Sequence, residues 1–292
     1  MRRSMLFLPG NTPNLILNGD SLGADAIILD LEDAVAPDQK DAARVLVRNA
    51  LKTLEFRGIE KIIRINSLDT PYWKKDLDEM MPCRPELIMT PKTSCAEDVL
   101  QFDAYMSETE ERLGFEKNSV RLMPLIETAL GVENAYEIAS ASDRVVAIFL
   151  GAEDLSADLR CERTKEGKEI FYARGRIVMA ARAAGKDAFD TPFTDVNDDE
   201  GIRADAALAK ALGFTGKASI SPRHLDAINE AFSPSEKEID YAYEVLKTIR
   251  LAEQQGRGAV ALLGKMIDKP IVMRAQQTIK MAEALGLGRE DE

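Results

Sequence analysis

The sequence is poor in the residues that build disulfide frameworks and zinc sites. Its 292 residues include three cysteines and a single histidine, His224. The cysteines Cys83, Cys95 and Cys161 form no CxxC pair and are odd in number, which favours reduced thiols over a disulfide framework. A lone histidine without a cysteine cluster argues against a zinc site.

Long hydrophobic runs and an excess of positive charge are also missing. The apolar run after Arg2 and Arg3 stops at Pro9 and Gly10, too early for a signal peptide, and no stretch approaches the roughly 20 apolar residues of a membrane span. Lys and Arg number 38 against 50 Asp and Glu, a net charge of −12, which argues against nucleic acid or an anionic membrane as a partner. We expect a globular, cytoplasmic protein.

Three nucleotide and hydrolase motifs are absent as well. The sequence contains no GxGxxG after an apolar run, no Walker motif and no GxSxG elbow, which lowers the rank of dinucleotide, sugar-phosphate and serine-hydrolase chemistry. Ser221 and His224 could still belong to a Ser-His-Asp set, but a lone histidine more often sits at the start of a helix. A small polycarboxylate is the favoured substrate, and it would need a local arginine or a metal.

Eight short apolar runs recur along the chain and alternate with helix-like segments. The runs begin at residues 4, 26, 61, 86, 120, 144, 187 and 216, and the clearest helix-like segments span 41–54, 131–142, 171–185 and 199–213. Continuous apolar runs are typical of parallel strands that are buried on both faces. Eight such units in roughly 220 residues predict an α/β fold, a TIM (β/α)8 barrel, with a doubly wound sheet as the alternative.

The pattern after Pro222 changes to helix without further strands. Helix-like segments cover 233–256 and 269–286, and Ser233 and Glu236 have the spacing of a capping box. This is more helix than a barrel needs after its eighth strand. We therefore predict a barrel catalytic domain over residues 1–232 and a C-terminal helical extension over 233–292 that acts as a lid or subunit contact.

Polar residues stand where the apolar runs stop, and a TIM barrel carries its active site at those strand ends. They are Asp30, Glu32, Arg64, Asn66, Lys92, Glu127, Glu153, Asp154, Asp190 and Ser221. The two-residue alternation of a strand predicts that Asp30, Glu32, Arg64 and Asn66 face the barrel mouth. It places Asp33 on the helix side, as a cap or a solvated charge.

Several carboxylates in one pocket repel each other unless a cation is present. All-oxygen ligands favour Mg²⁺, and we assign Glu127 and Asp154, after the fifth and sixth runs, to the metal. The alternative is that Glu127 caps the helix that follows it and that Asp154 does the same for its own loop. Arg64, with its planar fork, suits a substrate carboxylate. Lys92 could form a Schiff base, but an acidic rim would raise its pKa, which favours an ion partner.

A set of segments, taken together, resembles a known family. They are RRSMLFLPGN, LDLEDAVAPDQKDAAR, IIRIN, TPK, FLGAEDLSADLR, CERTKEG, AFDTPFTD, LGFTGKASISPRH and LLGKMIDKPIV, which span roughly residues 2 to 280. Their order and spacing are similar to those of the citrate lyase β-chain family within the HpcH/HpaI-type aldolases. The resemblance implies a (β/α)8 barrel that uses Mg²⁺ to cleave a carbon–carbon bond by a retro-Claisen reaction.

The resemblance also implies a substrate, partners and roles. The substrate would be a citryl thioester on an acyl carrier (γ) subunit, cleaved to oxaloacetate and acetyl thioester beside an α subunit that exchanges acyl groups. The family's metal carboxylates fall on Glu127 and Asp154, with Glu127 also close to substrate, and its substrate arginine falls on Arg64. Asp268, in GKMID at 264–268, would handle the methyl proton in a neighbouring subunit, or would cap a helix before Lys269. This predicts a homo-oligomer, a trimer or hexamer.

The sequence leaves open the roles of Asp30, Glu32 and Lys92 at the barrel mouth, and it leaves three alternative functions of the protein. Asp30 and Glu32 are expected to support catalysis by orienting Arg64 or Lys92, and Lys92 to contact substrate. The alternative functions are a CoA-dependent malyl-CoA or citramalyl-CoA lyase, a non-catalytic scaffold that holds the other subunits, and a metal-independent aldolase that uses Lys92.

Overall fold

The computed structural model describes residues 2–254, 260–262 and 265–289. Within these residues the chain forms two compact units, one covering Arg2–Asn229 and the other beginning at Glu230. Gly264 of the GKMID segment lies outside the described residues, as do 255–259 and 290–292 of the predicted extension.

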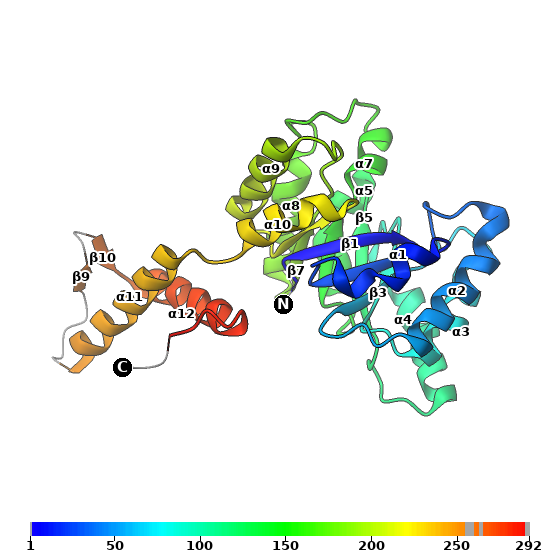
Figure 1. The fold of residues 1–292 in the computed structure, drawn as a ribbon, viewed down its shortest axis with the longest axis horizontal. Coiled ribbons are helices and arrows are strands. Elements are labelled where there is room, and N and C mark those ends of the chain that lie inside the picture. Colours follow the sequence, from blue (N-terminus) through cyan, green and yellow to red (C-terminus); the bar gives the residue numbers. More distant parts are fainter. Residues whose placement is uncertain (1, 255–259, 263–264, 290–292) are drawn as a thin grey trace. The chain divides into compact units, whose positions relative to one another are not determined.

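The first unit is a closed barrel of eight parallel strands (Figure 1). The strands are β1 Ser4–Pro9, β2 Ala26–Asp30, β3 Glu60–Arg64, β4 Leu87–Thr90, β5 Arg121–Ile126, β6 Ala147–Leu150, β7 Asp187–Asp190 and β8 Gly216–Ser219. Each strand pairs with the next along the chain, and β1 pairs with β8 to close the ring. The predicted TIM barrel is confirmed, and every strand falls within one of the eight apolar runs or at its edge.

Alternate residues of the strands fill the barrel interior. This core contains Met5, Ala26, Ile28, Ile62, Leu87, Met89, Met123, Leu125, Ala147, Phe149, Phe189 and Ala218. The intervening side chains, such as Ile27 and Ile63, are also fully buried, because helices cover the outer face of a parallel barrel. Burial on both faces explains why the sequence shows continuous apolar runs.

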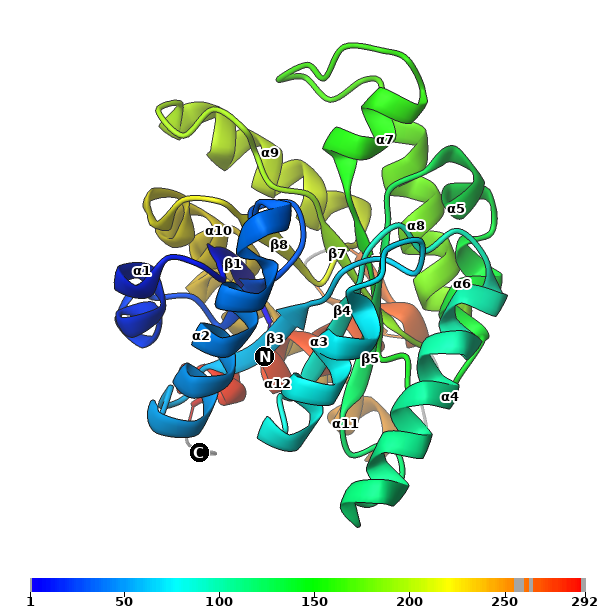
Figure 2. The same ribbon diagram turned by 90° about the vertical axis from the view of Figure 1, so that its right-hand side faces the viewer.

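Helices and short 3₁₀ turns surround the strands (Figure 2). The helices are α1 Pro13–Leu17, α2 Lys40–Thr53, α3 Trp73–Met80, α4 Ala96–Leu113, α5 Ala129–Glu133, α6 Ala135–Ser140, α7 Ala152–Asp158, α8 Phe171–Ala183, α9 Asp199–Leu212 and α10 Leu225–Phe232. The 3₁₀ turns are η1 Gly19–Ser21, η2 Pro37–Gln39, η3 Met81–Cys83 and η4 Pro222–His224. Helix α2 buries Ala43, Val47 and Ala50, whose spacing forms one face of a helix.

The second unit contains α11 Glu236–Gln254, β9 Val260–Leu262, β10 Lys265–Ile267 and α12 Lys269–Ala284. Its strands pair antiparallel, with Met266 opposite Ala261, so the prediction of helix without strands after Pro222 was wrong. Three-residue strands are too short to show alternation in a sequence. Its core is formed by Val245 on α11 together with Ile267, Ala275 and Ile279.

The capping box at the start of α11 lies two residues later than predicted. The Ser235 backbone N–H and hydroxyl both donate to Glu238 Oε2 at 2.8 Å, and Glu238 N–H donates to Ser235 Oγ at 3.3 Å. The prediction of Ser233 and Glu236 was wrong because the segment SPSEKE contains two overlapping pairs with the same spacing.

Two expectations about the whole chain concern membranes and disulfides. Among the described residues, no helix is both long enough and apolar enough to cross a membrane. Cys83, Cys95 and Cys161 are free thiols, as the odd count and spacing predict.

Candidate active site

Asp30 and Arg64 form an ion pair at the carboxyl ends of two adjacent strands. They are register partners in β2 and β3, and Arg64 Nε and Nη2 donate to the two Asp30 oxygens at 2.7 and 2.6 Å. The guanidinium also lies 5.0 Å from the centre of the Phe7 ring. Burial alone would lower the pKa of Arg64, but the Asp30, Glu32 and Asp33 carboxylates together outweigh it and the net shift of the pKa is upward. Arg64 is thus a fixed cation whose Nη1 is not used by Asp30.

Glu32 lies between the two cations of the mouth. Its Oε2 is 3.1 Å from Arg64 Nη1, and its Oε1 is 3.3 Å from Lys92 Nζ, which is 3.8 Å from Asp154 Oδ2. Burial lowers the pKa of Lys92, but the Glu32 and Asp33 carboxylates outweigh it and raise the pKa overall. A lysine that stays protonated is an ion partner and a poor Schiff-base nucleophile.

Glu127 reaches the mouth directly after the end of β5, and Asp154 reaches it from the first turn of α7. Glu127 is buried and its Oε1 accepts a hydrogen bond from the Lys92 backbone N–H at 2.7 Å. A Cβ on Gly151 would lie 2.6 Å from Glu127 Oε2, so only glycine allows this approach. Burial, together with the nearby Glu32 and Asp154 carboxylates, raises the pKa of the Glu127 carboxyl to about 8.

The alternative that these two residues cap helices does not fit the structure. Helix α5 has Thr128 as its N-cap, with Thr128 Oγ1 accepting from Gly131 N–H, and α7 has Gly151 as its N-cap. Glu127 precedes the first cap, and Asp154 follows the second. Neither carboxylate caps a helix, so both are available to bind a ligand at the mouth.

The donor set suits a hard divalent cation. The described residues contain no group of three or more His, Cys, Asp or Glu side chains placed to hold a metal ion. Mg²⁺, however, is usually bound by one or two carboxylates, with waters and substrate oxygens completing its shell. Glu127 is buried beside two further carboxylates, and its burial and their negative charge both raise its pKa. A bound cation would relieve this repulsion between negative charges. Glu127 and Asp154 thus fit Mg²⁺.

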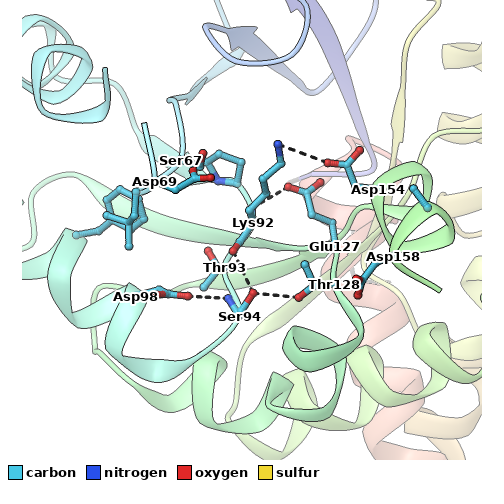
Figure 3. A pocket seen from close by; sticks show the side chains of 14 residues that line it. Ser67, Asp69, Lys92, Thr93, Ser94, Asp98, Glu127, Thr128, Asp154 and Asp158 are labelled. Carbon is cyan, nitrogen blue, oxygen red and sulfur yellow. Dashed lines mark hydrogen bonds and ion pairs between the residues drawn. The ribbon is translucent and has the colours of Figure 1, made fainter. Parts of the chain in front are cut away.

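Two cavities adjoin this carboxylate pair. The first, of about 420 Å³, is lined by Phe7, Pro9, Asp30, Asp33, Ala34, Arg64, Leu125, Glu127, Phe149, Gly151, Ala152, Glu153, Asp154, Thr191, Pro192 and Ile220. The second, of about 450 Å³, is lined by Ser67, Leu68, Asp69, Pro91, Lys92, Thr93, Ser94, Asp98, Phe102, Glu127, Thr128, Asp154, Ala157 and Asp158 (Figure 3). Glu127 and Asp154 belong to both cavities, whereas only the first contains Arg64.

Two predicted orientations were wrong because the strands end earlier than the alternation assumes. Asp33 was placed on the helix side, but it lines the first cavity and lies 3.8 Å from Arg64 Nη1. Asn66 was placed in the mouth, but it is buried and its Nδ2 donates to Asp76 of α3 at 2.7 Å. Strands β2 and β3 end at Asp30 and Arg64, and the two-residue rule does not hold in the loops that follow.

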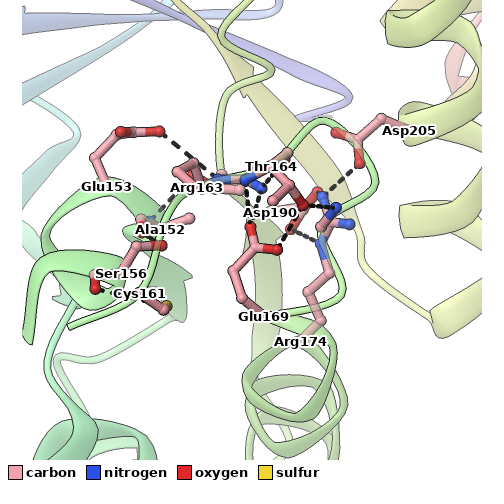
Figure 4. Close-up of polar contacts among 12 residues, drawn as sticks. Ala152, Glu153, Ser156, Cys161, Arg163, Thr164, Glu169, Arg174, Asp190 and Asp205 are labelled. Atoms are coloured by element: carbon pink, nitrogen blue, oxygen red, sulfur yellow. Dashed lines mark hydrogen bonds and ion pairs between the residues drawn. The ribbon is translucent and has the colours of Figure 1, made fainter. Parts of the chain in front are cut away.

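Two other rim candidates, Asp190 and Ser221, lie outside both cavities. Asp190 is completely buried and accepts hydrogen bonds from Arg174 Nε and Nη2 at 3.0 and 2.9 Å (Figure 4). It also accepts one from Lys217 Nζ at 2.7 Å. Ser221 caps η4, because its Oγ accepts from Arg223 N–H. Glu153 does line the first cavity, with an exposed side chain.

The residues that sequence reasoning missed are the walls of the first cavity. Phe7, Phe149, Thr191 and Ile220 line it. Phe7 could have been found, because it shares a strand face with Met5 and stands close to the end of the first apolar run. Thr191 follows a polar strand end, and nothing local in the sequence distinguishes it.

Asp268 is the N-cap of α12 in the second unit. Its Oδ1 accepts a hydrogen bond from Ile271 N–H at 3.1 Å, so the capping alternative is realised in this chain. A carboxylate that caps an exposed helix can still act on a neighbouring copy, and its catalytic role stays a prediction.

His224 does not form a catalytic set with Ser221. It ends η4, directly before α10, and is fully buried, with its ring 6.1 Å from the Phe193 ring between centroids. Within the described part of the chain, neither ring nitrogen is hydrogen bonded to a serine or a carboxylate. Burial lowers the pKa of His224, and the Arg223 and Lys217 cations act in the same direction, whereas Asp199 opposes them.

The lowered pKa of His224 predicts a loss of stability in mild acid. An unfolded histidine has a pKa near about 6.5, so below that pH the unfolded chain takes up a proton that the folded chain does not. The contribution of His224 to stability is therefore fully present above the unfolded pKa and is lost as the pH falls from that value through the lower pKa of the folded chain. Urea unfolding followed by the fluorescence of Trp73, the single tryptophan, should show a steeper decline between pH 7 and 5 than in His224→Gln.

The single histidine signal in an NMR titration checks the cause directly. We expect its midpoint below the value of a histidine peptide. A midpoint at or above that value would contradict the prediction, because protonation would then cost the folded chain nothing.

A closed (β/α)8 barrel with carboxylates, an arginine and a lysine at its carboxyl-end mouth defines a TIM-barrel enzyme. The chain belongs to the HpcH/HpaI aldolase/citrate lyase family, whose model matches residues 3–222, and the predicted family is confirmed.

Individual relatives give the finer similarity. The chain is 43% identical to the citrate lyase subunit beta of Leuconostoc mesenteroides subsp. cremoris, covering 97% of this chain and 94% of the relative. It is 36% identical to the L-malyl-CoA/beta-methylmalyl-CoA lyase of Cereibacter sphaeroides, covering 97% and 95%.

Two solved structures from Mycobacterium tuberculosis are similar as well. One is the citrate lyase beta subunit complexed with oxaloacetate and magnesium, at 31% identity and a TM-score of 0.68, covering 80% of this chain and 97% of that one. The other is the protein CitE in complex with magnesium, acetoacetate and coenzyme A, at 31% identity and a TM-score of 0.78, covering 97% and 98%.

Proposed function

We propose that the chain is a Mg²⁺-dependent carbon–carbon lyase that cleaves a citryl thioester to oxaloacetate and an acetyl thioester, as the β subunit of a citrate lyase. The observation that carries the proposal is the mouth itself. Arg64 and the pair Glu127 and Asp154 line one cavity of about 420 Å³, a size that suits a small polycarboxylate. The 43% identity to a citrate lyase subunit beta over nearly the whole chain supports the same function.

The bond changes of this reaction define what the site must do. The carbon–carbon bond between the hydroxyl-bearing carbon and the thioester methylene breaks, the hydroxyl loses its proton and becomes the ketone of oxaloacetate, and the thioester leaves as an enolate that gains a proton. Glu127 and Asp154 would hold Mg²⁺, which when bound would supply Lewis-acid stabilisation of negative charge on the substrate oxygens.

The cation Arg64 orients the substrate. Its Nε and Nη2 are held by Asp30, so a substrate carboxylate in the cavity that Arg64 lines would bind Nη1, which lies 3.1 Å from Glu32 Oε2. The planar fork of Arg64 is therefore not available as a whole to a substrate carboxylate, because Asp30 already occupies two of its three nitrogens. Asp30 thus fixes the guanidinium plane before substrate arrives, and preorganisation of this kind lowers the cost of reaching the transition state.

The other charged groups complete the assignment. Lys92 Nζ, between Glu32 and Asp154, contacts a second carboxylate of the substrate, and Glu32 holds Lys92 in place. Asp268 from a neighbouring copy exchanges the methyl proton of the acetyl thioester. The extension over 233–292 then acts as a lid and subunit contact in a homo-oligomer, a trimer or hexamer, and the α and acyl carrier (γ) subunits supply and receive the acyl groups.

A CoA-dependent malyl-CoA or citramalyl-CoA lyase is the second candidate. It is favoured by the 36% identity to an L-malyl-CoA/beta-methylmalyl-CoA lyase. Both functions would use the same mouth and the same bond cleavage, so they differ in the thioester carrier.

Steady-state assays with matched substrates test the proposed function. We expect kcat/KM for a citryl thioester on the acyl carrier subunit to exceed that for citramalyl-CoA and malyl-CoA by at least about a hundredfold, because a carrier protein adds contacts that CoA lacks. Efficient turnover of either CoA thioester without a carrier protein would overturn the proposal in favour of the second candidate.

Chelation separates the metal reaction from Schiff-base chemistry. Activity should disappear with EDTA and return with Mg²⁺. Activity that survives EDTA but is lost in Lys92→Ala would indicate the metal-independent aldolase.

A further inference from the structure

Helix α7 carries Asp154 in its first turn but lacks a cap of its own. Its N-cap is Gly151, which has no side chain, although Ser, Thr, Asp and Asn are the usual residues there because a side-chain oxygen accepts an orphan backbone N–H. A side chain is impossible at this position, since a Cβ on Gly151 would lie 2.6 Å from Glu127 Oε2 and 2.8 Å from Glu127 Cβ. Because Glu127 lies so close, the N-cap position of α7 has no room for a capping side chain.

The missing cap comes from the neighbouring strand. Thr191, directly after β7, is 2% exposed, and its Oγ1 accepts the hydrogen bond of Ala152 N–H, the first residue of α7, at 3.2 Å. Thr191 and Asp154 also line the same cavity. The hydroxyl therefore holds the helix turn from which Asp154 projects.

Thr191 is itself anchored by a buried ionic network. Lys217 Nζ donates to the Thr191 carbonyl oxygen at 2.6 Å and to Asp190 Oδ2 at 2.7 Å. Arg174 Nη2 lies 2.9 Å from Asp190 and 2.7 Å from Asp205 (Figure 4). Lys217 Nζ lies 2.6 Å from Asp205. Two cations and two carboxylates, all buried, thus fix the backbone on both sides of the Asp190–Thr191 bond.

We propose that Thr191 is a positioning residue for the metal site. Through its hydrogen bond with the Ala152 N–H, it fixes the first turn of α7 and so the position of Asp154 relative to Glu127. The Lys217 network in turn holds the Thr191 backbone in place. The inference rests on the proposed function only in taking Asp154 as a metal ligand. Groups that hydrogen-bond directly to a metal ligand typically contribute about 10- to 100-fold to metal affinity, and we expect Thr191, which acts through the helix turn, to lie at the lower end of that range.

The test compares Thr191→Val, which removes the hydroxyl, with Thr191→Ser, which keeps it. Mg²⁺ affinity is measured by isothermal titration calorimetry without substrate, and Mn²⁺ binding by electron paramagnetic resonance. We expect Thr191→Val to weaken Mg²⁺ binding by at least about tenfold and Thr191→Ser to stay within about twofold of the parent chain. Amide exchange over residues 151–158 should quicken in Thr191→Val alone.

Thr109→Val is the matched control. Thr109 lies on α4, is as buried as Thr191 at 2% exposure, and lines neither cavity, so its substitution reports the general effect of losing a buried hydroxyl. Equal losses of Mg²⁺ affinity in Thr191→Val and Thr109→Val would overturn the proposal. So would unchanged affinity and exchange in Thr191→Val, or a loss in Thr191→Ser as large as in Thr191→Val.

The binding assay is independent of the substrate. If the parent chain binds Mg²⁺ and Thr191→Val weakens it, but no citryl thioester is cleaved, the proposed function fails and the role of Thr191 stands. If the citryl thioester is cleaved and Thr191→Val changes neither binding nor exchange, the role of Thr191 fails and the proposed function stands.

Discussion

Asp154→Asn is expected to lower kcat/KM for thioester cleavage by at least about a hundredfold, the scale at which removal of one group that stabilises the transition state is felt. The substitution keeps the shape of the side chain and removes its negative charge, so the Mg²⁺ site loses one of its two carboxylates. Because the Asp154 side chain is 39% exposed, the barrel should remain folded. Calorimetry should show the lost Mg²⁺ affinity in the same sample.

Glu153→Gln provides the control for Asp154→Asn. Glu153 lies in the same first turn of α7 and its side chain is 63% exposed. Losing a charge at either residue weakens the favourable interaction of that turn with the helix dipole by a similar amount. We expect Glu153→Gln to retain Mg²⁺ binding and most of the activity. Full activity in Asp154→Asn, measured in the assembled complex, would instead support the scaffold alternative.

The barrel could be predicted because each of its strands corresponds to a continuous apolar run in the sequence. Each run from β1 to β8 is buried on both faces, inward by the core around Ile28, Ile62 and Phe149 and outward by the helices. Topology then brings the ends of all eight strands to one mouth. The proximity of Asp30, Arg64, Glu127 and Asp154 follows from the fold alone, without knowledge of any side-chain contact.

The errors arose where a periodic rule was applied beyond the end of its element. Asp33 and Asn66 each lie two or three residues past the last strand residue, where the backbone leaves the strand conformation and the side chain can turn to either side. The same limit explains the misplaced capping box at the start of α11. Local spacing is necessary for these features, but it does not say which of two overlapping candidates the chain will use.

Contacts between distant residues could not be predicted from local patterns. In the run GKASISP, Lys217 stands as one charge in a short apolar strand, and its partner Asp190 lies 27 residues earlier. A buried charge predicts that a partner exists, but it does not identify the partner. Asp190 was assigned to the rim because it stands where its apolar run stops, whereas its carboxylate belongs to the Lys217 network.

The same network predicts the largest change in stability. Lys217→Met should lower the free energy of unfolding of the barrel by about 3–5 kcal/mol, because removing one partner leaves the opposing carboxylate charge buried and uncompensated. Lys217, Arg174 and Asp190 are completely inaccessible to solvent, so water cannot replace the lost ammonium. Urea unfolding monitored by Trp73 fluorescence measures the barrel, because Trp73 lies in α3.

Two further variants separate this charge effect from the loss of a long side chain. Lys61→Met breaks the Lys61–Glu86 pair at the amino end of β3, which is partly exposed at 21% and 42%, and should cost about 1 kcal/mol or less. Lys217→Met combined with Asp205→Asn restores the charge balance and should recover part of the stability lost in Lys217→Met alone. If the double variant were no more stable than Lys217→Met, packing of the lysine stem, rather than an unpaired charge, would account for the loss.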